Sequence, residues 1–274
     1  MISCIVSVMN RTPQLEQMLP SWTQVKEIND FVIVDWSSDI PIIENYIVQQ
    51  QMEKYKNIKI IRVEGEEHFY RCLTWNLASK YIKNKIILKL DVDSINVDAS
   101  WMQYLKFHNS ALDRYYLIGM NFFYRDSSGF LLVNKEDFEA VNGYNENLLP
   151  TWGGDDIDLN LRLDDYLSKK YSLDQYGIFE FKNSRRLIFF DIKRYIYNIR
   201  HSDKERISYL QGKYPLEEGD IRDKMHDYSN VNKDIAIKQK EWKHKTYNII
   251  SESDNYIKLE RLKTSEKLER KRLE

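Results

Sequence analysis

Short apolar segments alternate with helical patterns along the first 98 residues, and this alternation restricts the fold more than any other feature. The apolar segments are SCIVSV (3–8), FVIVDW (31–36), IKIIRV (58–63) and IILKLDVD (86–93). Between them lie PQLEQMLPSW, which we expect to begin at Pro13 after Thr12 as its cap, then IIENYIVQQQMEKY and YRCLTWNLASKYI. This order predicts an α/β fold with an open, mostly parallel central sheet and helices on both faces.

Ligands of such sheets bind beyond the carboxyl ends of the strands, which selects the residues to inspect. These are Asn10 and Arg11 after the first segment, Asp35 in the second, and Asp91 and Asp93 at the end of the fourth. The last two are expected to project from the same side of the pleat. Carboxylates that enter a cleft together need a positive charge between them, which a divalent cation with a diphosphate would provide. Because D-x-D is a common pattern, a simple strand-end turn remains the alternative.

The segment TWGGDDIDLN (151–160) puts a tryptophan and two glycines in front of three aspartates. The glycines permit a positive φ or a close backbone approach, and DDIDLNLRL predicts a helix with the aspartates in its first turn. Acidic residues there can simply complement the helix dipole. Trp152, however, offers a flat apolar face to a sugar ring, and a carboxylate at a helix start in a cleft can accept a hydroxyl proton.

The alternation fades after residue 100. YYLIGMNFFY (115–124) and GFLLVNK (129–135) predict two strands joined by the turn-like RDSSG. From about Asp203 the sequence is highly charged and has a helical pattern, so we expect residues 206–274 to form a charged helical extension. This extension is either a solvated or packing arm, or a helix that contacts a membrane surface or a partner.

Composition argues against several classes of protein. With 41 Lys and Arg against 42 Asp and Glu, the formal charge is -1, so no global field favours nucleic acid or an anionic membrane. Cys4 and Cys72 lack the spacing of a disulfide or zinc framework, which favours a reducing compartment. The first residues have no basic start or cleavage site, and no apolar run has the length of a membrane span. We therefore expect a cytoplasmic protein.

Four segments, taken together, carry a resemblance to a known family. FYRCLTWN (69–76), KLDVDS (89–94), GFLLVNKEDFEAVNGYNENLLPTWGGDDIDLNLRL (129–163) and IRHSDKE (199–205) resemble, in order and roughly in spacing, the motifs of the inverting β-1,4-galactosyltransferases and their bacterial polysaccharide-synthesis relatives. The WGG-acidic segment with a downstream RHS is the specific part. The resemblance covers about residues 1–205 and implies a Rossmann-like GT-A domain, with a nucleotide-sugar-binding half at 1–98 and an acceptor-binding, catalytic half at 99–205.

The resemblance implies a divalent metal ion, Mn²⁺ or Mg²⁺, held by Asp93 and His201. In the family, a methionine three residues before that histidine is also a ligand. This chain has Asn198 at the position. Because an amide oxygen is a harder ligand than a thioether, the replacement would move the preference from manganese toward magnesium.

The family's substrate contacts also have counterparts. Phe69 would stack on uracil, Arg71 would reach the diphosphate, and Asp91 would face the ribose. Without the resemblance, Arg11 and Arg71 are equally well read as helix-surface charges. The further expected donor contacts, at positions where this fold usually meets the nucleoside, are Asn10, Arg11 and Asp35.

The catalytic base of the family aligns with Asp156. Trp152 would lie between the donor phosphate and the acceptor sugar, with Gly154 beside the substrate, and Asp155 would bind an acceptor hydroxyl. Asp158 is as well explained by the helix start. The family usually has Glu-Asp where this chain has Asp155 and Asp156, and the shorter first carboxylate points to a different acceptor.

The resemblance therefore implies a metal-dependent inverting glycosyltransferase that moves a hexose or N-acetylhexosamine from a UDP-sugar to a glycan or lipid-linked acceptor in bacterial surface polysaccharide synthesis. Peripheral contact with the inner face of the membrane, or with other assembly proteins, is compatible with this role. One alternative is a sugar-nucleotide nucleotidyltransferase, although VSVMNRTPQL lacks the glycine-rich phosphate loop that such an enzyme needs. Another is a non-catalytic glycan-binding protein that uses Trp152 and tyrosines.

Overall fold

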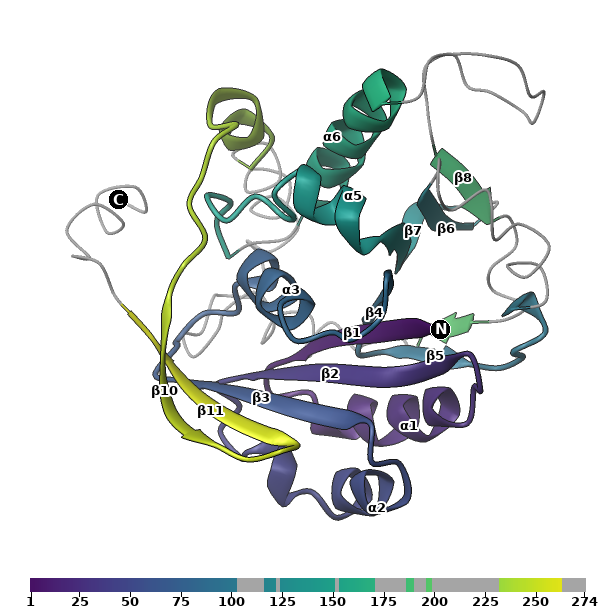
Figure 1. The fold of residues 1–274 in the computed structure, drawn as a ribbon, viewed down its shortest axis with the longest axis vertical. Helices are drawn as coiled ribbons and strands as arrows, with labels where there is room; N and C mark the ends of the chain where they lie inside the picture. The colour runs from purple at the N-terminus through teal and green to yellow at the C-terminus, as the bar shows by residue number, and fades with distance from the viewer. Residues whose placement is uncertain are drawn as a thin grey trace, which may run out of the picture.

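A 9-stranded mixed sheet with helices against both faces forms the centre of the protein (Figure 1). The structure is a computed structural model, and it describes residues 1–102, 116–121, 124–150, 153–170, 186–189, 196–198 and 232–262. The strand order is β10-β11-β3-β2-β1-β4-β7-β6-β8. The strands are β1 (Ile2–Val8), β2 (Ile28–Trp36), β3 (Ile58–Glu64), β4 (Ile86–Asp91), β6 (Tyr116–Asn121), β7 (Tyr124–Asn134), β8 (Arg186–Phe189), β10 (Tyr247–Glu252) and β11 (Tyr256–Arg261).

The helices confirm the predicted α/β order of the first half. They are α1 (Thr12–Thr23), the 3₁₀ helix η1 (Ile42–Glu44), α2 (Tyr46–Lys54), α3 (Arg71–Ser79), α5 (Lys135–Ala140) and α6 (Asp155–Lys170), and a short helix also spans residues 232–238. The strands β3, β2, β1 and β4 are parallel, as expected. A separate small sheet pairs β5 (Ser94–Asn96) with β9 (Ile196–Asn198).

The predicted cap of the first helix is wrong, because Thr12 is already its first residue and Arg11 holds the N-cap position. Pro13 still lies in the first turn, where its missing N–H loses no hydrogen bond. The second helical segment divides at Asn45. Its side-chain oxygen accepts hydrogen bonds from the backbone N–H groups of Ile47 and Val48, which caps α2.

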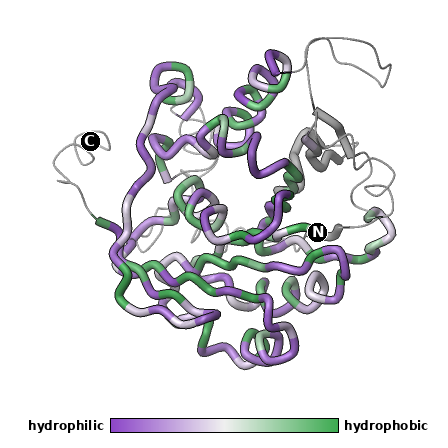
Figure 2. Tube along the Cα trace, in the orientation of Figure 1, coloured by the Kyte–Doolittle hydropathy of each residue, from purple (hydrophilic) through white to green (hydrophobic). Residues whose placement is uncertain are grey.

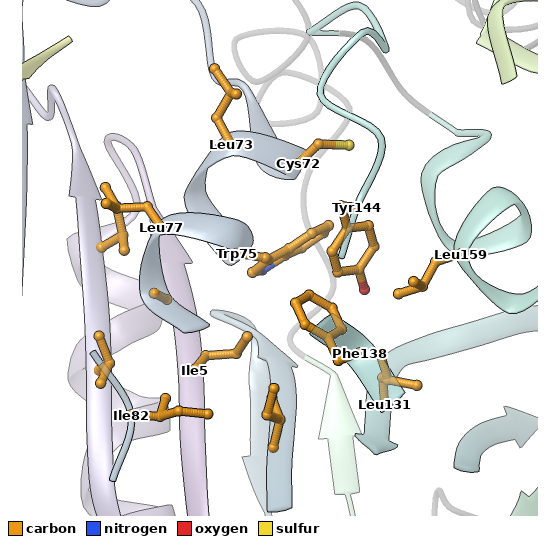
Figure 3. Packing of buried hydrophobic residues seen from close by; sticks show 14 of the residues in the cluster. Ile5, Cys72, Leu73, Trp75, Leu77, Ile82, Leu131, Phe138, Tyr144 and Leu159 are labelled. Atoms are coloured by element: carbon orange, nitrogen blue, oxygen red, sulfur yellow. The ribbon is translucent and has the colours of Figure 1, made fainter. Parts of the chain in front are cut away.

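Two hydrophobic cores lie on opposite faces of the sheet. Leu88 and Leu90 of β4 pack with α1 and α2 on one face, whereas Ile87 of the same strand packs with α3, α5 and α6 on the other. This follows from the alternation of side chains along a strand. In the second core, the rings of Trp75 and Tyr144 lie 4.7 Å apart between centroids (Figure 3). That face carries the candidate site.

The second half of the sheet is antiparallel where it joins the first. β7 pairs antiparallel with both β4 and β6, and β6 pairs in parallel with β8. The predicted turn RDSSG lies inside β7, and the two strands instead meet at the pair Asn121 and Tyr124. The expectation of two strands is confirmed, but the turn was placed too late in the sequence.

The predicted helical extension is wrong for residues 247–261, which form β10 and β11 and extend the central sheet. β11 pairs in parallel with β3. Its Ile257 and Leu259 are buried in the second core, while Lys258 between them forms an ion pair with Glu64, 2.9 Å away. This two-residue alternation is the strand signal that the high charge of the segment concealed. The extents of the predicted domains remain a prediction.

Residues 239–245 run from helix 232–238 toward β10 along the turn after α5, and they are mainly hydrophilic (Figure 2). Three asparagine side chains of that turn hold them, because Asn142, Asn145 and Asn147 donate to the backbone carbonyls of Trp242, Gln239 and Glu241. The carboxylate of Glu146 accepts from the backbone N–H of Lys245 at 2.7 Å. The C-terminal segment is therefore attached to the half of the molecule that carries α6.

Among the described helices, none combines the length and the apolar character needed to cross a bilayer. Cys4 and Cys72 are both buried, and in the described part of the chain neither forms a disulfide.

Candidate active site

The two aspartates of the D-x-D segment do not both lie in β4, contrary to the prediction. β4 stops at Asp91, and residues 92–93 form a turn before β5 begins at Ser94. Asp91 Oδ1 lies 3.1 Å from Lys89 Nζ, whereas Asp93 Oδ2 lies 3.7 Å from Arg11 Nη1. The two carboxylates are therefore not successive side chains on one face of a pleated strand, and each meets a different basic group.

The small sheet brings a distant segment to this turn. In the antiparallel pairing of β5 with β9, Ser94 lies opposite Asn198, so the backbone of Asn198 is next to the residue that follows Asp93. His201 lies outside the described residues. Within the described ranges, no group of three or more His, Cys, Asp or Glu side chains could hold a metal ion. The pairing nevertheless brings together the backbones of two of the three predicted metal-ligand positions.

The two glycines before α6 both have positive φ, 88° at Gly153 and 89° at Gly154, which confirms the prediction from their sequence position. A Cβ atom at Gly154 would lie 2.9 Å from the Cβ of Asn232. Asn232 in turn donates from Nδ2 to the carbonyl of Gly153 at 3.0 Å and accepts from the backbone N–H of Leu149 at 3.0 Å. A residue from the C-terminal segment therefore fixes the loop that leads into α6.

Asp155 connects α6 to α3. Its Oδ1 lies 3.3 Å from Arg71 Nη2, and its side chain is 6% exposed. Its Oδ2 is buried and has no hydrogen-bond partner among the described residues. Both side chains line a small pocket, together with Leu148, Pro150 and Asn232. A buried carboxylate oxygen without a partner can accept a hydrogen bond from the hydroxyl of a ligand.

Asp156 is the more exposed of the two neighbouring aspartates, with 35% of its side chain accessible. The hydroxyl of the buried Tyr144 donates to its Oδ1 at 3.3 Å, and Lys89 Nζ lies 3.6 Å from the same oxygen. Burial raises the pKa of Asp156 and outweighs the opposing effect of Lys89, with the charges of Asp155 and Asp91 adding to the rise. A carboxylate with a raised pKa and partial exposure is suited to accept a proton.

Asp158, the third aspartate of the helix start, has a structural partner. Its Oδ2 accepts from Arg162 Nη2 at 2.5 Å and from Nε at 3.0 Å. The same guanidinium donates to the carbonyls of Val141 and Gly143 and stacks over Trp242, with its centre 4.8 Å from the ring centroid. Asp158 therefore anchors the turn before α6, which is more than a helix-dipole role.

The predicted donor residues are dispersed over the first half. Asn10, at φ 56°, accepts from the backbone N–H of Asp39 at 2.7 Å. Asp35 is fully buried and accepts from Arg62 Nη1 at 2.6 Å and from the backbone N–H groups of Ser38 and Ile42 at 3.1 Å. Asp35 thus shapes the loop after β2 and does not stand as an open carboxylate in a cleft.

Of the aromatic predictions, Phe69 belongs to the second core with 9% exposure. Trp152 lies outside the described residues. Arg11 and Arg71, which the sequence alone leaves as possible surface charges, instead face Asp93 and Asp155. The structure thus gathers Arg11, Arg71 and four of the predicted aspartates around the ends of β4 and α3 and the start of α6.

Sequence reasoning missed three residues of this site. Lys89 carried a signal, since a lysine interrupts the otherwise apolar segment IILKLD. Tyr144 gave no signal in the sequence that distinguishes it from the other tyrosines. Asn232 gave no signal, because it lies 78 positions beyond Gly154 in a segment taken for an extension.

Comparisons with known proteins bear on the family that this chain resembles and on its fold. The sequence profile of a family described as the N-terminal domain of galactosyltransferase matches residues 115–183, which include the start of α6. No curated protein sequence matches the chain at a significant level.

Solved structures share the fold at low sequence identity. TarS from S. aureus superposes with a TM-score of 0.53 at 15% identity over 85% of this chain, which spans 43% of that protein's length. A TarS fragment in complex with UDP-GlcNAc gives 0.52 at 13% identity, covering 89% of this chain and 68% of the fragment. Drosophila β-1,4-galactosyltransferase 7, in complex with manganese, UDP-Gal and xylobiose, gives 0.50 at 13% identity, covering 96% and 94%. The chain thus has the GT-A glycosyltransferase fold and resembles the β-1,4-galactosyltransferase family and its bacterial relatives.

Proposed function

We propose that this chain is a metal-dependent inverting glycosyltransferase that moves a hexose or N-acetylhexosamine from a UDP-sugar to a hydroxyl of a glycan or lipid-linked acceptor. The observation that carries the proposal is Asp156. It is a partly exposed carboxylate at the start of α6, held by the hydroxyl of Tyr144 beside the D-x-D end of β4. The shared fold with proteins whose complexes contain UDP-sugars supports the donor class.

The donor would lie along the ends of β1, β4 and α3. Arg11 and Arg71 supply positive charge for the diphosphate, and both already face carboxylates of the site. Asp91, which pairs with Lys89 but has 40% of its side chain exposed, would face the ribose, and Phe69 would stack on the uracil. A planar base and a double negative charge are matched by these residue types.

A divalent ion, Mn²⁺ or Mg²⁺, would lie beside Asp93. Its carboxylate is 14% exposed and faces Arg11, and the β5–β9 pairing carries Asn198 to the adjoining residue. Carboxylate, amide oxygen and imidazole are ligands that such ions accept, so Asp93, His201 and Asn198 would hold it. A bound ion would supply electrostatic stabilisation of the leaving diphosphate.

The reaction would be a single displacement. The acceptor hydroxyl attacks the anomeric carbon, its oxygen forming the new glycosidic bond while Asp156 accepts its proton. The bond between that carbon and the diphosphate breaks, and UDP leaves with the electron pair, so the configuration inverts. Asp155 would orient the acceptor through its buried Oδ2, and Trp152 would face the sugar. Positioning and a placed base are the contributions of the protein.

We also propose a place for this reaction in bacterial surface polysaccharide synthesis, on the cytoplasmic side of the membrane and with peripheral contact to it or to other assembly proteins. The resemblance to bacterial polysaccharide-synthesis relatives supports this. The acceptor would then be a growing or lipid-linked saccharide.

A donor screen tests the proposal. Release of the nucleoside diphosphate is measured with UDP-glucose, UDP-galactose, UDP-GlcNAc and UDP-GalNAc, and with a GDP-sugar and a CDP-sugar for comparison. Each donor is tested with Mn²⁺, Mg²⁺ or EDTA, and with and without saccharide acceptors. We expect turnover of at least one donor that EDTA abolishes, and a higher melting temperature with UDP and metal, because a ligand of the folded state stabilises it. Turnover of GDP- or CDP-sugars alone would contradict the donor class, and turnover in EDTA would contradict the metal.

A further inference from the structure

Lys89 occupies an unusual position for a lysine. It lies in β4 at the middle of the sheet, opposite Ile5 of β1 and Leu131 of β7, and its side chain is 1% exposed. Its neighbours on both sides in sequence, Leu88 and Leu90, are fully buried. Removing an ammonium group from water is unfavourable unless opposite charges compensate, so the surroundings of Lys89 must supply them.

Three groups from three elements surround the ammonium. Asp91 Oδ1 of β4 lies 3.1 Å from Nζ, Asp156 Oδ1 of α6 lies 3.6 Å away, and the ring centroid of Trp75 in α3 lies 3.9 Å away. Figure 3 shows Trp75 reaching from α3 toward Tyr144, whose hydroxyl holds Asp156. One buried cation therefore links a proposed donor-side carboxylate to the proposed base.

We propose that Lys89 is a positioning residue that keeps Asp156 ionised and oriented to accept the acceptor proton, an inference that rests on the proposed function. The resemblance assigns no role to this position. The ammonium approaches Asp156 from the sheet below it, and Tyr144 holds the same carboxylate oxygen. Among the residues that the structure describes, none forms a hydrogen bond with the other carboxylate oxygen, which would face the substrate.

The electrostatics around Asp156 define what Lys89 contributes. Burial, Asp155 and Asp91 all raise the pKa of Asp156, whereas Lys89 and Arg71 lower it. Because Arg71 already pairs with Asp155, Lys89 is the main group that lowers the pKa of Asp156. Burial lowers the pKa of Lys89 itself, but the charges of Asp156, Asp91 and Asp155 prevail and raise it, so the ammonium stays charged at neutral pH. Within the described part of the chain, the charged and titratable side chains facing Asp156 are Lys89, Asp91, Arg71, Cys72, Tyr144 and Asp155.

The sign of the effect follows. A general base works only when it is deprotonated, so activity falls as the pH drops below the pKa of the base. Removing the Lys89 charge leaves burial and two carboxylates opposed by Arg71, whose effect is smaller than that of Lys89, so the pKa of Asp156 rises. The acidic limb of the pH profile must therefore move to higher pH. A loss of packing alone would lower activity at every pH by the same factor.

The test compares two neutral variants, Lys89→Met and Lys89→Gln, with the charged variant Lys89→Arg. The profile of kcat/KM against pH is measured for each, and melting temperature and UDP binding check the fold. We expect the acidic limb of the neutral variants to move upward by roughly one to three units, the usual effect of one nearby opposite charge. At a pH below the pKa of the base, each unit of this upward shift lowers kcat/KM about tenfold, and activity recovers at high pH. Lys89→Arg should keep the limb near its original place.

The outcomes separate the two claims. If the unaltered protein turns over no UDP-sugar, the proposed function fails. If it is active and a folded neutral variant keeps the original acidic limb, the inference on Lys89 is wrong. If both neutral variants fail to fold while Lys89→Arg folds, the charge serves stability, and the inference is equally overturned.

Discussion

The three aspartates at the start of α6 lie within four positions of the sequence, yet their neighbours give them different tasks. Asp155 faces Arg71, Asp156 faces Tyr144 and Lys89, and Asp158 faces Arg162. The sequence predicts that the cluster lies in a first helical turn. It cannot predict the division, because most of these partners come from α3, β4 and the turn before the helix. Only Arg162, four positions after Asp158, was within local reach.

Asp158→Asn tests the structural assignment. The change removes the charge that holds Arg162, which also fixes the carbonyls of Val141 and Gly143. Because the Asp158 side chain is 7% exposed, we expect unfolding free energy to fall by about 1–3 kcal/mol in denaturant titration. The matched control is Asp165→Asn, which breaks the exposed pair with Lys169 in the same helix and should change stability by less than about 0.5 kcal/mol. Equal effects of the two changes would refute a special role for Asp158.

At the scale of elements, the sequence predicts what depends on local period and misses what depends on distant pairing. β1 to β4 and α1 to α3 have clear apolar periods, and all were predicted, although the cap of α1 was placed one residue too late. β11 was not, because its partner β3 lies almost two hundred residues earlier and its charged residues find partners only in the folded sheet. Arg261, for example, pairs with Glu66 at 2.6 Å and 2.9 Å. The segment therefore forms a strand and not the predicted helix, because pairing with β3 stabilises the extended conformation.

Asn232→Ala tests whether the C-terminal segment positions the loop before α6. The change removes the hydrogen bonds to the carbonyl of Gly153 and from the backbone N–H of Leu149. Because this loop leads to the proposed acceptor residues, we expect a higher acceptor KM, with UDP binding unchanged. The control is Asn147→Ala, whose exposed amide holds only the carbonyl of Glu241. If both variants keep the original acceptor KM, the loop does not depend on Asn232.

The whole molecule explains why the site lies where it does. The sheet carries two cores, and the site forms on the face covered by α3, α5 and α6, at the carboxyl end of β4. This location was predictable from the parallel order of the strands. The roles of Lys89 as counter-ion and of Tyr144 as hydrogen-bond donor were not predictable from the sequence. Both depend on contacts with Asp156 that form only when α6 packs against β4 and the turn before α6.

Turnover of Asp156→Asn tests most directly whether Asp156 is the general base. The amide keeps the shape of the side chain but cannot accept the acceptor proton. We predict that kcat falls by roughly 10²–10⁴-fold while the Kd for the UDP-sugar stays the same. Asp155→Asn, measured beside it, should instead raise the acceptor KM, since it weakens a ground-state contact. Near-normal turnover by a folded Asp156→Asn enzyme would contradict the account.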